Sequence, residues 1–393
     1  MAAKKAIRIN RAHGRTPAGV LPLAIFLVWG LVFGTMASAD PVDLATAHRV
    51  AAAEIQRHID LTGAWGDVPT ARIDSAETVW LEGVAVAHHF RVHPAGHLLV
   101  AADDRFSPVL LYSPASDFDP ANLDDPASVE AWVLPEILET LERLEESVSA
   151  GFRVLSSVEN EGARRITTAW SLYLPEGGST VRALSGATTL PRSSTGLLVG
   201  PMMSSRWGQG AYYNDRIPAV AGNCDHALTG CVATAFSQVM RYWQWPYAGE
   251  GGHSYQWAGQ AVATDFGTPY DWDLMPDRLS GDSSAAAVDA VAHLMADVAV
   301  AVETDFGCGS SSSIRYGDEI LDRFFRYKSQ MVRHARSRYS ASGWFGLIQN
   351  ELDAQPPRPM LFSIFTENWS GHEVVIDGYQ TGPTDKVHIN MGW

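Results

Sequence analysis

The sequence predicts an α+β protein of two domains. Segments with helical periodicity are interleaved with segments that alternate in the manner of strands. The chain has 393 residues, and at roughly 150 residues per domain it is long enough for two domains. A hydrophobic content of 46% with only three cysteines is typical of a folded globular chain rather than a disordered or disulfide-rich one.

The first 39 residues have the features of a secretory signal peptide. Five basic residues precede an apolar run from Val20 to Gly34, and the small-residue motif "ASA" follows at Ala37–Ala39. We therefore expect cleavage after Ala39 and export from the cell, to the medium or a periplasm. The alternative is a membrane anchor, but such a span needs about 20 apolar residues and this run is shorter. We expect no membrane association after cleavage.

Charge and motif content exclude several functional classes. The 29 Lys and Arg residues against 44 Asp and Glu give a formal charge of −15 at pH 7, so nucleic acid is not an expected partner. The sequence contains no H-E-x-x-H, G-x-S-x-G or P-loop motif. His88, His89, His93 and His97 suggest a metal site, but no cysteine or carboxylate has zinc-site spacing with them. We expect these histidines on both faces and at the tip of a hairpin, and no metal or organic cofactor.

The first predicted domain spans residues 40–151 and is a small α+β unit. It has a helix near Leu44–His58, several strands across residues 78–113, and an amphipathic helix from about Pro126 to Val148. Residues 152–196 then lose periodicity and end in "SGATTLPRSSTG", which contains Arg192. This composition predicts an exposed, protease-sensitive linker.

The second predicted domain spans residues 197–393 and contains Cys231 at the start of a helix. The apolar stripe of this helix runs to Trp243, and Thr229 is a candidate N-cap. Unpaired N–H groups and the helix dipole favour a thiolate in the first turn, so the cysteine could be a nucleophile. A small buried core residue is the alternative.

A histidine near the end of the chain favours the nucleophile. His372 begins a strand predicted at residues 374–376, and a second strand is predicted at residues 386–390. A hairpin centred near Thr381 would place Asn390 across from His372, where its amide could hold the imidazole. A cysteine on a helix followed by a histidine on a later strand is the order found in papain-like enzymes.

These motifs together resemble the streptopain family of secreted bacterial cysteine peptidases. The resemblance rests on "WGQGAYYN", "TGCVATAFSQVMRYW", "LMADVAVAVETDFGCGSSSS", "GHEVVIDGY" and "HINMGW". "HLLVAADDRFSPVLLYS" likewise resembles the inhibitory propeptide domain of that family. The resemblance implies a papain-like catalytic domain over residues 197–393, with a helix-rich half that carries the nucleophile and an antiparallel sheet half. It also implies a propeptide domain that blocks the site until the linker near Arg192 is cut.

Position by position, the resemblance assigns roles to five residues. Cys231 matches the nucleophile and His372 the base, as a thiolate–imidazolium pair that in papain-like enzymes lowers the cysteine pKa to roughly 3–4. Gly371 and Ser312 match substrate-contacting positions, and Trp393 matches a tryptophan that packs near the histidine. The implied substrates are proteins or peptides.

The sequence departs from the family pattern at two positions. Met391 replaces a tryptophan, so we expect a less rigid wall beside the histidine. Asp225 stands six positions before the cysteine, where papain-like enzymes have a glutamine that donates to the oxyanion, and a carboxylate cannot donate. Either the backbone N–H of Cys231 acts with Gln209 or His226 as a second donor, or the alignment is shifted by one residue.

Two further expectations concern the chain end and the remaining cysteines. The family continues beyond the position of Trp393 with a glycine-rich loop and more strands, so we expect a truncated sequence that can be inactive where the complete protein is active. Cys224 and Cys308 could form a disulfide in an oxidising compartment and leave Cys231 free. Two unpaired buried thiols are the alternative.

We therefore expect a secreted cysteine endopeptidase made as a zymogen. Two other functions stay open. One is a catalytically inactive homologue that acts as a binding or inhibitory protein. The other is an amidase or transferase that uses Cys-His chemistry on the same fold.

Overall fold

The computed structural model describes residues 41–122, 130–149, 166–174, 197–220, 224–309, 311–313, 318–328, 331–365, 371–382 and 385–392. The predicted signal peptide, Arg192 and Trp393 lie outside these residues, and for Ser312 only the backbone is described. Within the described ranges, no helix has both the length and the hydropathy of a membrane span.

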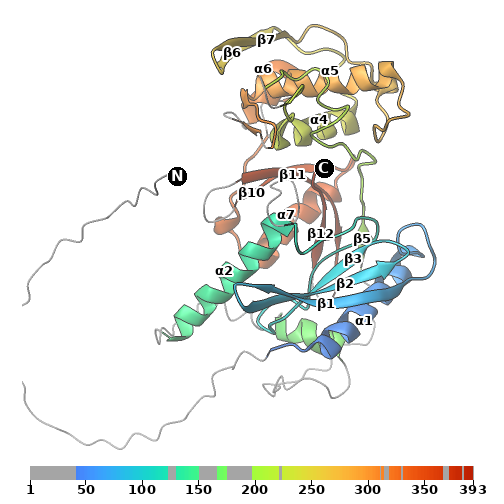
Figure 1. Cartoon of the computed structure of the whole chain (residues 1–393). Coiled ribbons are helices and arrows are strands. Elements are labelled where there is room, and N and C mark those ends of the chain that lie inside the picture. The colour runs from blue at the N-terminus through green and yellow to red at the C-terminus, as the bar shows by residue number, and fades with distance from the viewer. Residues whose placement is uncertain are drawn as a thin grey trace, which may run out of the picture. The chain divides into compact units, whose positions relative to one another are not determined.

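The N-terminal part of the described chain is an antiparallel four-stranded sheet in the order β1-β2-β3-β4 with helices on both faces (Figure 1). Leu98 of β3 lies in the same apolar cluster as Ile55 of α1. Leu99, its neighbour on the strand, lies in a different cluster with Leu134 of α2. Because successive strand residues point to opposite faces, the two helices cover opposite faces of the sheet. The elements are α1 (Leu44–Thr62), β1 (Arg72–Leu81), β2 (Val84–His93), β3 (His97–Ala101), β4 (Val109–Ser113) and α2 (Glu130–Ser149).

The predicted linker is not wholly a linker. Residues 166–173 form a helix, and Trp170 is only 2% exposed within the N-terminal core. The Trp170 indole donates to the Phe106 carbonyl at 2.9 Å. The N-terminal domain therefore extends at least to residue 174, beyond the boundary predicted at residue 151.

The four histidines of this domain lie on the β2–β3 hairpin, with His88, His89 and His93 on β2 and His97 on β3. The β2–β3 turn joins His93 to His97. His88 and His97 are buried, with ring nitrogens that donate to the carbonyls of Val42 at 2.7 Å and Ser116 at 2.8 Å. Among the described residues, no cluster of His, Cys, Asp and Glu has the arrangement of a metal site.

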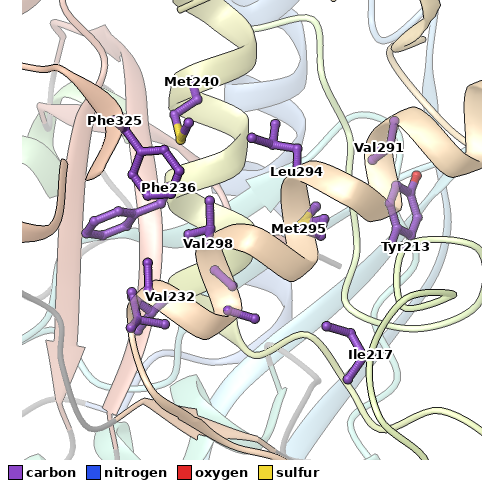
Figure 2. Close-up of a cluster of buried hydrophobic side chains, with 14 of the residues drawn as sticks. Tyr213, Ile217, Val232, Phe236, Met240, Val291, Leu294, Met295, Val298 and Phe325 are labelled. Carbon is purple, nitrogen blue, oxygen red and sulfur yellow. The ribbon is translucent and has the colours of Figure 1, made fainter. Parts of the chain in front are cut away.

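The C-terminal part combines a helical half with an antiparallel sheet in the order β10-β11-β12, in which β5 also pairs with β11 (Figure 1). Figure 2 shows Val232, Phe236 and Met240 of α4 packed against Leu294, Met295 and Val298 of α5. The helices and longer strands are α4 (Cys231–Trp243), β6 (Gly252–Trp257), β7 (Gln260–Asp265), α5 (Ala285–Ala301), α6 (Asp318–Phe325), α7 (Ala341–Leu352), β10 (Met360–Phe365), β11 (Gly371–Gln380) and β12 (Lys386–Asn390). The short elements are β5 (Leu198–Val199), β8 (Thr304–Asp305), β9 (Ser312–Ser313), η1 (Trp272–Leu274) and η2 (Arg336–Arg338).

Helix α4 has the bounds that its apolar stripe predicts, but its cap differs. The N-cap is Gly230, with φ of 88°, and no side chain caps the helix. Thr229 is instead hydrogen-bonded through its hydroxyl to Thr234 at 3.0 Å. Glycine suits this position because other residues rarely adopt a positive φ.

The register of the β11–β12 hairpin corrects the predicted pairing. Asn390 lies opposite Val375, not opposite His372. The register shifts between Ile376 and Gly378, so Asp377 is an extra residue on β11. The buried Asp377 carboxylate accepts from the backbone N–H of Met203 at 2.9 Å, which stabilises this bulge.

Candidate active site

Cys231 is the first residue of α4 and the only free thiol, because Cys224 and Cys308 form a disulfide across 84 residues. The backbone N–H groups of Glu373 and Val232 donate toward its sulfur. Since Glu373 directly follows His372 on β11, the fold brings the thiol to the start of the strand that carries the histidine. Cys231 and Glu373, which are 142 positions apart in the sequence, thus lie next to each other.

The environment of Cys231 favours the protonated thiol. Burial raises its pKa, and the nearby Glu373 carboxylate also raises it. The backbone N–H groups act in the opposite direction but do not outweigh burial. In this conformation the thiol is therefore not activated.

His372 is similarly held in its neutral form. The side chain is 5% exposed, and its Nε2 donates to the carbonyl of Met391 at 2.8 Å. Burial lowers the pKa of His372 to about 4, although the Met391 carbonyl opposes this shift. The arrangement thus contains a thiol and a neutral imidazole rather than the thiolate–imidazolium pair that the resemblance implies.

Asn390 does not occupy the predicted place beside the imidazole. Its side chain forms a reciprocal amide pair with Gln238 of α4, at 2.9 and 3.0 Å, and donates to the Ser205 carbonyl at 2.8 Å. These bonds fix the end of β12 against α4. The group that accepts from His372 is the carbonyl of the next residue, Met391, so Asn390 positions the chain rather than the ring.

The two candidate oxyanion donors differ in their relation to Cys231. The Gln209 carbonyl accepts from the backbone N–H of Thr229 at 3.1 Å, two residues before the cysteine. His226 is exposed, and its Nδ1 donates to the Ile217 carbonyl at 2.8 Å. The Gln209 backbone therefore lies close to the start of α4, whereas the His226 ring is hydrogen-bonded to Ile217.

Gly371 and the serine run belong to different parts of the C-terminal domain, β11 and the segment around β9. Gly371 pairs with Phe365 across the β10–β11 ladder, and a Cβ at this glycine would come within 2.8 Å of the Phe365 ring. In the serine run, the Ser311 hydroxyl donates to the Leu228 carbonyl at 2.8 Å. Ser312 follows in β9, where it pairs with Asp305.

Two residues with contacts in this region, Gln238 and Glu373, were not predicted from the sequence. Gln238 lies seven positions after Cys231 on the same helical face, a spacing that could have indicated it. Glu373 is an acidic residue next to the apolar run of a buried strand. Because acidic residues are rarely buried without a partner, this contrast could have indicated a functional position.

A buried ionic cluster joins the N-terminal domain to the C-terminal sheet. Glu54 of α1 is 0% exposed and accepts from Lys386 of β12 at 2.9 Å, from Arg57, and from the Tyr173 hydroxyl. Burial raises the pKa of Glu54, but Lys386 and Arg57 outweigh it and hold that pKa below its usual range. The cluster therefore contains an ionised carboxylate at the contact between the two domains. Its two charged partners, Glu54 and Lys386, are 332 residues apart in the sequence.

Comparison with known proteins places these motifs in a family. Residues 207–393 match the model of the Peptidase C10 family. The thiol protease/hemagglutinin PrtT of Porphyromonas gingivalis is 30% identical over 308 residues, which cover 76% of this chain and 31% of that protein. Streptopain of Streptococcus pyogenes is 31% identical over 182 residues, which cover 43% of this chain and 44% of that protein. The chain thus spans less than half the length of these relatives.

A solved structure supports the fold. A fragment of prointerpain A from Prevotella intermedia superposes with a TM-score of 0.58 at 24% sequence identity, covering 81% of this chain and 89% of that one. This similarity confirms the predicted α+β class, in which a papain-like domain follows a smaller N-terminal domain along the chain.

Proposed function

The chain belongs to the Peptidase C10 family, and on this premise we propose that it is a cysteine endopeptidase synthesised as a latent precursor. The observation that carries the proposal is the free thiol of Cys231 at the start of α4, in contact with the amide that follows His372. A nucleophile on a helix N-terminus and a base on a neighbouring strand are what thioester chemistry needs.

In the proposed mechanism, the Cys231 sulfur attacks the carbonyl carbon of a peptide bond. His372 takes the thiol proton and passes it to the departing amine, which leaves a thioester on the sulfur. A water molecule then gives a proton to His372 and attacks the thioester, which releases the acid and restores the thiol. The backbone N–H of Cys231, with Gln209 as the favoured second donor, would stabilise the oxyanion. Asn390 would act by holding the Met391 carbonyl in place for the imidazole.

The N-terminal domain is proposed to be the inhibitor of this site. The Glu54–Lys386 contact and the unactivated states of Cys231 and His372 both support a latent form. Activation would require cleavage between residues 174 and 197, a segment that includes Arg192. Substrates would be proteins or peptides, and the first 39 residues would direct secretion.

Covalent labelling followed by substrate digestion tests the proposal. An epoxide warhead that targets thiol peptidases should attach to Cys231 of the processed natural protein, as located by peptide mapping. Casein should then be degraded, and prior labelling should stop the degradation. Absence of labelling would indicate an inactive binding homologue, whereas labelling without casein digestion would indicate an amidase or transferase.

A further inference from the structure

Glu373 is an acidic side chain held beside the nucleophile, and the mechanism above leaves it without a role. It pairs with Ser363 across the β10–β11 ladder, two positions from the Gly371–Phe365 pair. Because strand side chains alternate, Glu373 lies on the same face of β11 as Val375. Val375 packs in one apolar cluster with Ala235 of α4, so this is the face that α4 covers.

The position of Cys231 on α4 places the thiol next to Glu373. Cys231 precedes Ala235 by four residues, which is about one helical turn on the same side of the helix. Since Ala235 lies over Val375, the preceding turn lies nearer the start of β11, where Glu373 is found. The hydrogen bond from the Glu373 N–H to the Cys231 sulfur agrees with this geometry.

The Glu373 carboxylate is buried but borders an accessible edge. The residue is 8% exposed, whereas Ser363 on the neighbouring strand is exposed and Phe365 is 51% exposed. Its Oε2 accepts from the Ser363 hydroxyl. Within the described part of the chain, no side chain or backbone amide is hydrogen-bonded to its Oε1. Among the described residues, the second carboxylate oxygen of Glu373 is therefore open to a hydrogen-bond donor.

The charges around Glu373 indicate which ligand would fit. Burial raises the pKa of this carboxyl, while the Ser363 hydroxyl and the positive charge of Arg333 oppose the shift. During catalysis a thiolate forms beside it, and two negative groups at one place repel each other. A cation that donates to Oε1 would relieve this repulsion and form a charge-assisted hydrogen bond.

We propose that Glu373 is a specificity-determining residue that selects peptides with lysine or arginine within two positions of the scissile bond. The inference rests on the proposed peptidase function. In this proposal, the basic side chain of the substrate supplies the positive charge that compensates the buried Glu373 carboxylate next to the thiolate.

A matched set of peptides and variants tests this inference in the processed natural protein. Fluorogenic peptides differ only in Lys, Arg, Gln or Leu at each position around the cleaved bond. At one position kcat/KM for Lys or Arg should exceed that for Gln by about 10-fold or more, as expected for one charge-assisted bond. Glu373→Gln should collapse this ratio to near 1, and Glu373→Asp should partly retain it. Glu351→Gln, an exposed acid on α7 paired with Arg358, should leave the ratio unchanged.

The outcomes separate this inference from the proposed function. Cleavage with equal kcat/KM for Lys and Gln at every position, or a preference that survives in Glu373→Gln, would overturn the role of Glu373 and leave the peptidase intact. If the wild type cleaves none of the peptides and takes up no thiol-directed warhead, the proposed function fails and the specificity role with it. Thermal unfolding of each variant checks that a collapsed ratio does not reflect loss of fold.

Discussion

Replacing Cys231 with serine should lower kcat/KM for peptide hydrolysis by roughly 10⁴-fold or more, the scale seen when a catalytic nucleophile is removed. A serine hydroxyl is a much weaker acid and a poorer nucleophile than a thiol, so attack assisted by proton transfer to His372 becomes far slower in a site built for a thiol. The fold should persist because the two side chains are similar in size and Cys231 is only half-buried.

The measurement is turnover of a fluorogenic peptide by wild type and variant after the N-terminal domain has been removed by an added protease. Thermal unfolding of both proteins serves as the control for folding, and Cys231→Ala should behave like Cys231→Ser. Retention of more than about 1% of wild-type turnover in either variant would rule out Cys231 as the nucleophile.

Replacing Glu54 with glutamine should release the N-terminal domain. The substitution leaves the Lys386 ammonium buried without its carboxylate, and breaking a buried ion pair costs about 3–5 kcal/mol. Association of the cleaved domain with the remaining chain should weaken by about 100-fold or more, because each 1.4 kcal/mol corresponds to a factor of ten. The dissociation constant of the nicked protein, measured by size-exclusion or fluorescence titration, reports this change.

Two comparisons separate the interdomain contact from the stability of the N-terminal domain. Lys386→Met removes the same pair from the side of β12 and leaves the interior of the N-terminal domain unchanged. Glu77→Gln, an exposed acid on β1, is the matched control and should have no effect. Equal dissociation constants for wild type, Glu54→Gln and Lys386→Met would contradict a role for the cluster in holding the domains together.

The pH dependence of this contact follows from the direction of the Glu54 shift. The pKa of Glu54 is lower in the folded state than in the unfolded state. Its contribution to stability is therefore complete above the ordinary glutamic acid range and is lost as the pH falls through the lowered folded value. Strong acid should weaken domain association in the wild type, and Glu54→Gln should lose this part of the dependence.

Helices and strands with a clear pattern in their own residues could be predicted from the sequence. The apolar stripe of α4 and the charged and apolar alternation of β12 fixed both elements to the residue. The short helix at residues 166–173 was missed because eight residues give too few repeats to reveal a periodicity. Composition instead suggested a linker there.

The geometry of the site depended on features that sequence spacing does not encode. Gln380 pairs with Lys386, so the hairpin is centred two residues later than Thr381, and Asn390 lies opposite Val375 rather than His372. The bulge at Asp377 shifts this pairing by one residue and is stabilised by a distant amide, that of Met203. The Glu54–Lys386 pair joins positions 332 residues apart, so only the tertiary structure brings them together. Thus the candidate nucleophile and base could be named from the sequence, whereas the imidazole partner and the interdomain contact could not.

Mass spectrometry of the natural full-length precursor tests the central claim most directly. Wild type and Cys231→Ser are incubated under reducing conditions at mildly acidic pH, and the masses of the products are followed over time. We predict that the wild type alone separates its N-terminal domain by cleavage between residues 174 and 197. If neither protein is processed and no thiol-directed reagent attaches to Cys231, the cysteine is structural and the peptidase assignment is wrong.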